Sequence, residues 1–313
     1  MEQTNNYESF CEQMKEAVVR AFPEHTVEVR DVVKNNGLHL DSLMIRKEGE
    51  KISPNFYLNQ LYEEYQQGKS VREILDDMVR LHEQSIQEYE NLKIDFTYES
   101  CKDKIVLRLA SGEWNSEILE EIPYIPFLDM VIVFCVVLRV EKDEIGSVRI
   151  SNQLQEQWDI STQSLFVQAL ENSQRLFPAK SDRLLHMLEE RMPMAERREF
   201  ATFLEREYEE EEDASFVLTN TCGINGATVI LYPDVLRQMG ERFGRDYYLL
   251  PSSIHEFLAV PCHPGLSGDK LEFMVREVNR TCVAREELLS EKVYYYRIQT
   301  GKVLIWNDGK SSS

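Results

Sequence analysis

The chain has 313 residues, of which 42% are apolar and 29% are charged, a balance that indicates a folded globular protein and excludes a disordered one. Its 35 Lys and Arg residues stand against 55 Asp and Glu residues, which gives a formal net charge of −20. This charge repels the phosphate backbone of nucleic acids and anionic membrane surfaces, so neither is an expected partner.

The length exceeds that of a usual single domain, and we predict two α+β domains, at residues 1–92 and 93–313. The N-terminus lacks a secretory signal, and the most apolar stretch, Met130 to Leu138, is too short to cross a membrane. Widely spaced cysteines without a CxxC pair indicate reduced thiols. We therefore expect a cytoplasmic location. The six cysteines are Cys11, Cys101, Cys135, Cys222, Cys262 and Cys282.

The first 92 residues predict the order α-β-β-α-α. Apolar residues at spacings of three and four from Tyr7 to Phe22 indicate a helix that ends at Pro23. Alternating runs on either side of Asn35-Asn36-Gly37 indicate a β-hairpin. Ser53-Pro54 is typical of a helix start, and Ser70 with Glu73 has the spacing of a capping box that opens the next helix.

The middle of the chain predicts a weakly helical connector followed by a sheet. Residues 91–129 have a faint helical pattern, with Ile105 and Leu109 as core positions. The continuous β-branched run Val131–Leu138 is typical of a central strand covered on both faces. A second strand, Ser147–Ile150, and a helix capped by Ser161 follow. A polar helical tract is then expected from Asp182 to Glu212.

The C-terminal third predicts four strands, two helices and a closing hairpin. Because strands and helices do not alternate strictly, the fold class is α+β with a mainly antiparallel sheet in the larger C-terminal segment. The expected elements are strands Phe216–Thr219, Tyr247–Leu250, Phe257–Val260 and Val229–Leu231, helices Pro233–Phe243 (ending at Gly244) and Leu271–Val278, and a hairpin from Tyr294 to Trp306.

Three stretches carry a resemblance to a known family: Ile52-Ser53-Pro54 with Tyr57-Leu58, Pro123 to Asp129, and Asn225-Gly226-Ala227 to Tyr232 with Leu250 to Glu256. The chain resembles an uncharacterised bacterial family of gut Firmicutes, known as a domain of unknown function, and Pro251-Ser252-Ser253-Ile254-His255-Glu256 is the most specific stretch. The resemblance implies a cytoplasmic bacterial protein and no activity. Val131 to Leu176 is also similar to part of the YtpQ-like proteins, which are uncharacterised too.

The strongest candidate site surrounds the short strand after His255. Side chains that can bind a metal or act as nucleophile and base lie at its two ends. The catalytic candidates are Ser252, His255, Glu256, Cys262 and His263, and the metal candidates are His255, Glu256, Cys262 and His263. The motifs HExxH and CxxC and a glycine-flanked serine are absent. The alternative is that His255 and Ser252 cap backbone groups in a turn.

Four other features have a structural interpretation that we prefer. We interpret Cys222 to Gly226 as a tight loop whose glycines take positive φ rather than as a reactive thiol site. We interpret Asp129 with Glu120-Glu121 as solvated charges rather than as a carboxylate pair for acid or base catalysis. Tyr294-Tyr295-Tyr296 fits sheet packing better than base stacking. The acidic run Glu205–Asp213 fits a solvated helix end better than a docking site for cations or a basic partner.

We predict a cytoplasmic bacterial protein without catalytic activity that binds or regulates a protein or a small molecule. The sequence is compatible with a homo-oligomer. No cofactor is predicted. The alternative function is a metal-dependent or hydrolase-like enzyme centred on the five catalytic candidates, which requires at least three of them to converge in one pocket.

Overall fold

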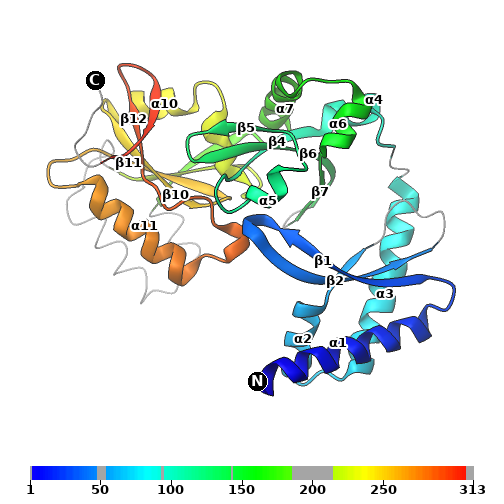
Figure 1. Cartoon of the computed structure of the whole chain (residues 1–313). Coiled ribbons are helices and arrows are strands. Elements are labelled where there is room, and N and C mark those ends of the chain that lie inside the picture. The colour runs from blue at the N-terminus through cyan, green and yellow to red at the C-terminus, as the bar shows by residue number, and fades with distance from the viewer. Residues whose placement is uncertain (1, 48–53, 93–94, 142–143, 185–213, 308–313) are drawn as a thin grey trace. The chain divides into compact units, whose positions relative to one another are not determined.

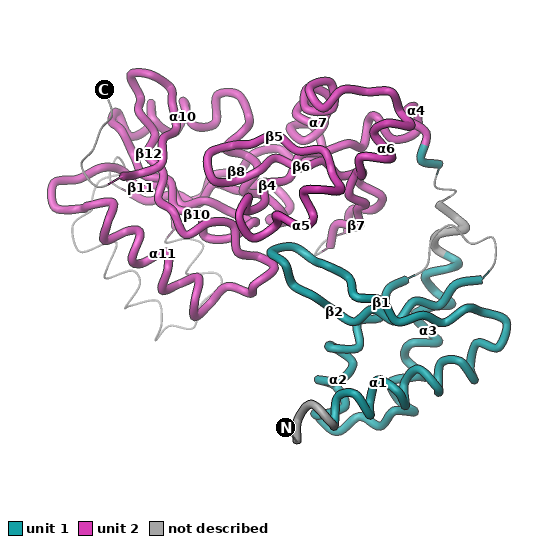
Figure 2. The backbone as a smooth tube through the Cα atoms, viewed as in Figure 1, with its two compact units in different colours: residues 1–96 teal, residues 97–313 magenta. Residues whose placement is uncertain are grey.

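The computed structural model describes residues 2–47, 54–92, 95–141, 144–184 and 214–307. They form two compact units, residues 1–96 and 97–313 (Figure 2). Both units combine helices with antiparallel sheets, so the α+β class is confirmed. Whether each unit folds independently stays a prediction.

Unit 1 packs three helices against a three-stranded antiparallel sheet of order β1-β2-β3 (Figure 1). The predicted hairpin is confirmed, because β1 pairs with β2 along its whole length. The helix expected from Pro54 begins later, since residues 55–57 pair with β2 as a short third strand. The elements are α1 (Glu2–Ala21), β1 (Thr26–Lys34), β2 (Leu38–Arg46), β3 (Asn55–Tyr57), α2 (Leu58–Gln66) and α3 (Val71–Leu92).

The predicted stripe of α1 supplies much of the core of unit 1. Its buried side chains pack with those of β2, β3, α2 and α3 in one apolar cluster, which explains why the helix forms although its outer face is polar. The fully or nearly fully buried members are Phe10, Met14, Val18, Phe22, Leu43, Ile45, Phe56, Leu58, Ile74 and Met78.

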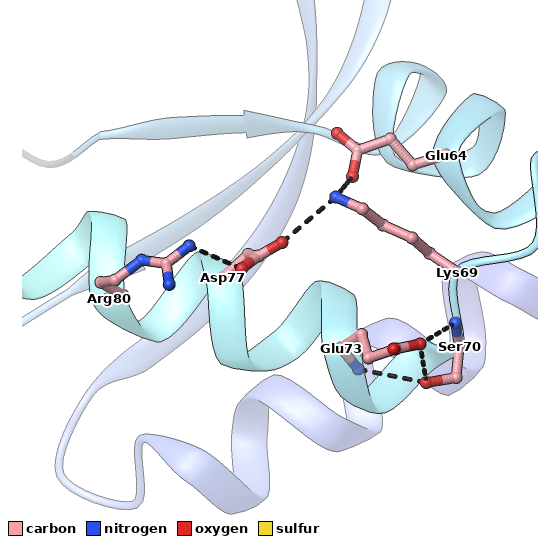
Figure 3. A network of polar contacts seen from close by, with 6 residues as sticks. All are labelled: Glu64, Lys69, Ser70, Glu73, Asp77 and Arg80. Atoms are coloured by element: carbon pink, nitrogen blue, oxygen red, sulfur yellow. Dashed lines mark hydrogen bonds and ion pairs between the residues drawn. The ribbon is translucent and has the colours of Figure 1, made fainter.

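The capping box at the start of α3 is confirmed (Figure 3). The backbone N–H of Ser70 donates to Glu73 Oε2 at 2.9 Å, and the N–H of Glu73 donates to Ser70 Oγ at 3.3 Å. The Ser70 N–H therefore lowers the pKa of the Glu73 carboxyl. Lys69 bonds to Glu64 at 2.6 Å and to Asp77 at 3.2 Å, so it connects the end of α2 to the first turns of α3.

The smaller sheet of unit 2 is built around β6, as predicted. This strand pairs with β4 on one side and with β5 and then β7 on the other. The helical connector expected over residues 91–129 is wrong, because it contains two strands of this sheet. The elements are α4 (Tyr98–Cys101), β4 (Ile105–Ser111), α5 (Ser116–Leu119), β5 (Tyr124–Phe127), β6 (Met130–Val140) and β7 (Ile145–Arg149).

Helices α6 (Asn152–Trp158) and α7 (Thr162–Leu176) follow this sheet. Ser161 caps α7 as predicted by accepting a bond from the Ser164 N–H. The polar side chains of α7 also bond to the free edge of β4. Asn172 Nδ2 donates to the Ile105 carbonyl at 2.9 Å, and the Leu107 N–H donates to Ser173 Oγ at 2.9 Å. These bonds satisfy an edge that would otherwise expose backbone groups.

The larger sheet of unit 2 has six antiparallel strands in the order β13-β12-β10-β11-β9-β8. Apart from Val229–Leu231, which forms a 3₁₀ turn, the strands and helices predicted after Phe216 are confirmed. Gly244 ends α10 in the left-handed conformation as expected. The elements are β8 (Ala179–Arg183), β9 (Phe216–Asn220), α10 (Val235–Phe243), β10 (Tyr247–Ser253), β11 (Glu256–Pro261), α11 (Gly268–Cys282), β12 (Tyr294–Arg297) and β13 (Lys302–Ile305).

The two faces of this sheet have separate cores. Leu271 and Val275 of α11 pack on the face that carries Tyr248, and Phe243 of α10 packs on the face that carries Tyr247. The three consecutive tyrosines of β12 alternate between these faces, with Tyr294 and Tyr296 on the α10 side. Sheet packing of this tyrosine run is therefore confirmed.

Two expectations fall partly or wholly outside the described residues. The helical tract predicted from Asp182 is wrong at its start, where β8 occupies residues 179–183. Its remainder and the acidic run Glu205–Asp213 lie in the range 185–213, outside the described residues. Among the helices that the structure describes, none has the length and apolarity needed to span a membrane.

Candidate functional site

Three of the predicted site residues lie at the turn of the β10–β11 hairpin. Ser253 pairs with Glu256 across the turn, so Ser252, His255 and Glu256 are neighbours. The Ser252 hydroxyl donates to Glu256 Oε1 at 3.2 Å, and the His255 N–H donates to Ser253 Oγ at 3.0 Å. The hydroxyl of the proposed nucleophile therefore bonds to a carboxylate of its own hairpin.

The imidazole of His255 has a partner at each nitrogen. Nδ1 accepts the backbone N–H of Asn225 at 3.1 Å, and Nε2 lies 3.3 Å from Glu287 Oε1. A backbone N–H can only donate, so Nδ1 carries the lone pair and Nε2 the proton, which points at the carboxylate. A metal ion or substrate that binds either nitrogen must first displace one of these partners.

Backbone bonds tie the same turn to two other segments. The carbonyl of His255 accepts from Thr219 Oγ1 at 2.8 Å, which connects the turn to β9. The Ile254 N–H donates to the Glu287 carbonyl at 2.8 Å, and the Ile254 carbonyl accepts from the Ala227 N–H at 3.2 Å. The turn thus joins β9, the loop at residues 225–227 and the loop at 287. This arrangement supports the structural interpretation of His255.

The predicted tight loop from Cys222 to Gly226 needs its two glycines for different reasons. Gly223 has φ +68° and open space around it, as expected. Gly226 does not have a positive φ, so that part of the prediction is wrong. It is required because a Cβ there would meet Thr219 Oγ1, would lie 2.6 Å from the His255 carbonyl oxygen and would lie 2.7 Å from the Asn220 nitrogen. The loop and the hairpin turn can approach this closely only with glycine.

The other two candidates, Cys262 and His263, follow β11 at its far end. The register places Tyr247 opposite Pro261 there, whereas Ser253 is opposite Glu256 at the turn. The strand between them spans about 20 Å at 3.4 Å per residue. The five catalytic candidates therefore do not meet in one site, which corrects the expectation of a single centre. The metal candidates separate into two pairs, and no group of three or more potential ligands exists within the described ranges.

The Cys262 thiol is kept neutral by its surroundings. Burial, and after it the negative charge of Asp246, raise its pKa to about 12, although hydrogen bonds with the Tyr295 and Tyr248 side chains oppose the rise. Asp246 is itself held by the Tyr295 hydroxyl at 2.7 Å and the Ile298 N–H at 2.9 Å. Because the thiolate is the nucleophile and metal ligand, Cys262 is unsuited to both tasks at neutral pH.

We expect Cys262 to resist alkylation in the folded protein. With iodoacetamide at pH 8, exposed Cys282 should be modified at least about tenfold faster than Cys262, because only a very small thiolate fraction forms at Cys262. Peptide mass spectrometry over time measures both rates. In denaturant the two rates should converge. Equal rates in the folded protein would contradict the neutral, partly buried state of this thiol.

Asp129 is a partly buried anchor that the sequence interpretation treated as a solvated charge. It lies in the turn between β5 and β6 and accepts the Ser290 hydroxyl at 2.7 Å and the Tyr294 hydroxyl at 2.6 Å. It therefore joins the smaller sheet to the larger one. The preceding residue, Leu128, has φ +59°, a strained value for a branched side chain. Glu120 and Glu121 are exposed.

Sequence reasoning also missed two arginines of the smaller sheet. Arg108 of β4 and Arg149 of β7 share one face of the sheet, because they belong to the rows that contain Val133 and Cys135 of β6. One signal was present: Arg108 interrupts the otherwise apolar run Ile105–Ala110. Cys222 packs into the apolar cluster around Cys135 on the same face, which agrees with a structural role for that thiol.

Comparison with known proteins supplies a family and no activity. The model of a family of unknown function, DUF5688, matches residues 7–298 and so covers nearly the whole chain. No curated protein matches the chain. No solved structure matches it.

Proposed function

Because the chain belongs to the family of unknown function DUF5688, which provides no reaction, we propose from its residues that it is a non-enzymatic binding or regulatory protein of the bacterial cytoplasm. The observation that carries this proposal is the double occupation of His255 by the Asn225 N–H and Glu287. An imidazole that holds two loops together is poorly placed to act as a base or a ligand. The free state of all six thiols is the state that a reducing compartment maintains.

The proposed partner is a small molecule or a protein. The net charge of −20 disfavours nucleic acids and anionic membranes, because both carry charge of the same sign. A second copy of the chain is also compatible with this proposal. The partner is expected to contact the protein without chemical change.

The second candidate function is a hydrolase-like or metal-dependent enzyme, favoured by the approach of His255 to Glu287 and of Ser252 to Glu256 in one turn. A histidine beside a carboxylate is one part of the serine hydrolase arrangement. However, that arrangement needs the nucleophile on the other ring nitrogen, and here Nδ1 accepts a backbone N–H. The Asn225 bond would have to break before this turn could work.

Metal analysis and thermal unfolding of wild type and His255→Ala distinguish these two functions. We expect no stoichiometric metal, and melting temperatures that respond equally to Mg²⁺, Mn²⁺ and Zn²⁺ in the two proteins. His255→Ala itself should melt about 2 to 6 °C lower, since two bonds that join loops are lost. Wild type should hydrolyse p-nitrophenyl acetate and p-nitrophenyl phosphate no faster than the variant.

Two results would support the enzyme. One is metal that copurifies with wild type and is lost with His255→Ala, or that raises only the melting temperature of wild type. The other is turnover that disappears in both His255→Ala and Ser252→Ala while Ser253→Ala retains it, because the Ser253 hydroxyl bonds to the His255 N–H, whereas the Ser252 hydroxyl bonds to the Glu256 carboxylate.

A further inference from the structure

Arg108 reaches across the central strand of the smaller sheet towards Arg149. Its Nη2 donates to Ser147 Oγ of β7 at 2.6 Å, although β6 lies between the two strands. Ser147 and Arg149 are two residues apart on β7 and so point to the same face. The guanidinium of Arg108 therefore lies beside a hydroxyl whose strand neighbour is a second cation.

No carboxylate among the described residues pairs with either guanidinium. Acidic residues outnumber basic ones by 55 to 35. By contrast with the two guanidiniums, Arg139 of the neighbouring strand β6 pairs with both Glu141 and Glu144. Two neighbouring cations without a counter-charge repel each other. A protein with an excess of carboxylates places them together at a cost that a bound anion would remove.

The surroundings of Arg149 are crowded and still open to solvent. Burial lowers the pKa of its guanidinium, and the positive charge of Arg108 lowers that pKa as well, while Cys135 opposes the shift. The residue nevertheless keeps an exposed surface. A ligand can therefore reach the guanidinium, and an anion there is less screened by water than at an open surface.

We propose that Arg108, Ser147 and Arg149 bind the phosphate group of a small-molecule phosphate monoester. This site rests on the proposed binding function and names its ligand. Two guanidiniums match the double negative charge of a phosphate monoester, whereas one carboxylate leaves a positive charge uncompensated. Arg108 retains donors beyond the one used by Ser147, and the Ser147 hydroxyl, which accepts from Arg108, can donate its own proton to a phosphate oxygen.

Tyr124 can contact the organic part of the ligand. This residue of β5 lies in the same cross-strand row as Arg108 and Val133, about two strand spacings or roughly 10 Å from Arg108. Its side chain is 40% exposed, so the ring is accessible. An aromatic or apolar group attached to the phosphate can pack on this ring.

Titration calorimetry on the full chain with phenyl phosphate, inorganic phosphate and acetate tests the site. Phenyl phosphate should bind with one-to-one stoichiometry, more tightly than inorganic phosphate and at least about tenfold more tightly than acetate, which carries a single carboxylate. Arg149→Gln and Arg108→Gln should each lower the affinity for phenyl phosphate by at least about tenfold, because a charge-assisted bidentate contact is lost. Tyr124→Ala should abolish only the preference for phenyl phosphate over inorganic phosphate.

Arg297→Gln is the matched control, because it makes the same charge change at an exposed position of β12 in the same unit. It should leave the affinity unchanged within about twofold. Without ligand, the melting temperature of Arg149→Gln should be no lower than that of wild type, since the repulsion between Arg149 and Arg108 is removed. A loss of binding in this variant therefore cannot come from unfolding. Absent binding of phenyl phosphate, or equal losses in Arg149→Gln and Arg297→Gln, would overturn the site. These results differ from those that would overturn the proposed function, which are metal binding or turnover that depends on His255.

Discussion

Gly226→Ala should destabilise the protein by about 3 kcal/mol, at the upper end of the cost of overpacking a well-packed site. The added Cβ would meet Thr219 Oγ1 and would lie 2.6 Å from the His255 carbonyl oxygen and 2.7 Å from the Asn220 nitrogen. The Asn220 nitrogen belongs to β9, and the His255 carbonyl belongs to the hydrogen-bonded turn between β10 and β11, so neither backbone atom can move aside cheaply. For a unit of this size we expect a fall in melting temperature of roughly 6 to 12 °C.

Gly223→Ala in the same loop is the control for this prediction. Its φ of +68° disfavours alanine, but no atom lies within 4 Å of the added Cβ. The expected loss is about 1 kcal/mol, or roughly 2 to 4 °C, from backbone strain alone. Calorimetric melting of both variants measures the difference. Equal effects would show that the loop does not press against the hairpin turn as the structure has it.

Asp129→Ala should lower the free energy of unfolding by about 3 kcal/mol, because it removes two hydrogen bonds to a charged acceptor. It also leaves the hydroxyls of buried Ser290 and Tyr294 without this acceptor. The expected fall in melting temperature is again roughly 6 to 12 °C. Leu128→Gly, one residue away, should instead raise stability by up to about 1 kcal/mol, because glycine relieves the positive φ.

A double-mutant cycle with Tyr294→Phe isolates the Asp129 contact. Tyr294→Phe alone should cost about 1.5 kcal/mol, and the two substitutions together should cost less than their sum by at least about 1 kcal/mol. Denaturant unfolding of the four proteins measures the coupling. A coupling near zero would mean that Asp129 does not connect the smaller sheet to β12.

Local signals in the sequence predicted most helices and hairpins, because their determinants lie within a few residues. The capping box of Ser70 and Glu73, the Asn35–Gly37 turn and the Gly244 helix stop all formed as expected. Strand β4 was missed because Arg108 interrupts its apolar run, so it has neither the continuous run that marked β6 nor a period-two pattern. Strand β3 was missed because it exists only through pairing with β2.

The candidate site was less accessible to sequence reasoning, because it depends on contacts between distant segments. The residues from Ser252 to His263 are close in sequence, but an extended strand separates them. The partners that decide the role of His255 are Asn225 and Glu287, both about 30 residues away. Arg108 and Arg149 meet only through strand pairing with β6, and Asp129 meets Ser290 only when the two sheets pack together.

The protonation of His255 tests the account most directly, because the non-enzymatic function rests on both ring nitrogens being engaged. Nitrogen-detected NMR of the imidazole, assigned with His255→Gln, should show a protonated Nε2 and an unprotonated Nδ1 at neutral pH. Equimolar Zn²⁺ should leave both resonances in place. A protonated Nδ1, or zinc-induced shifts of either nitrogen, would show that His255 is available for chemistry and would contradict the account.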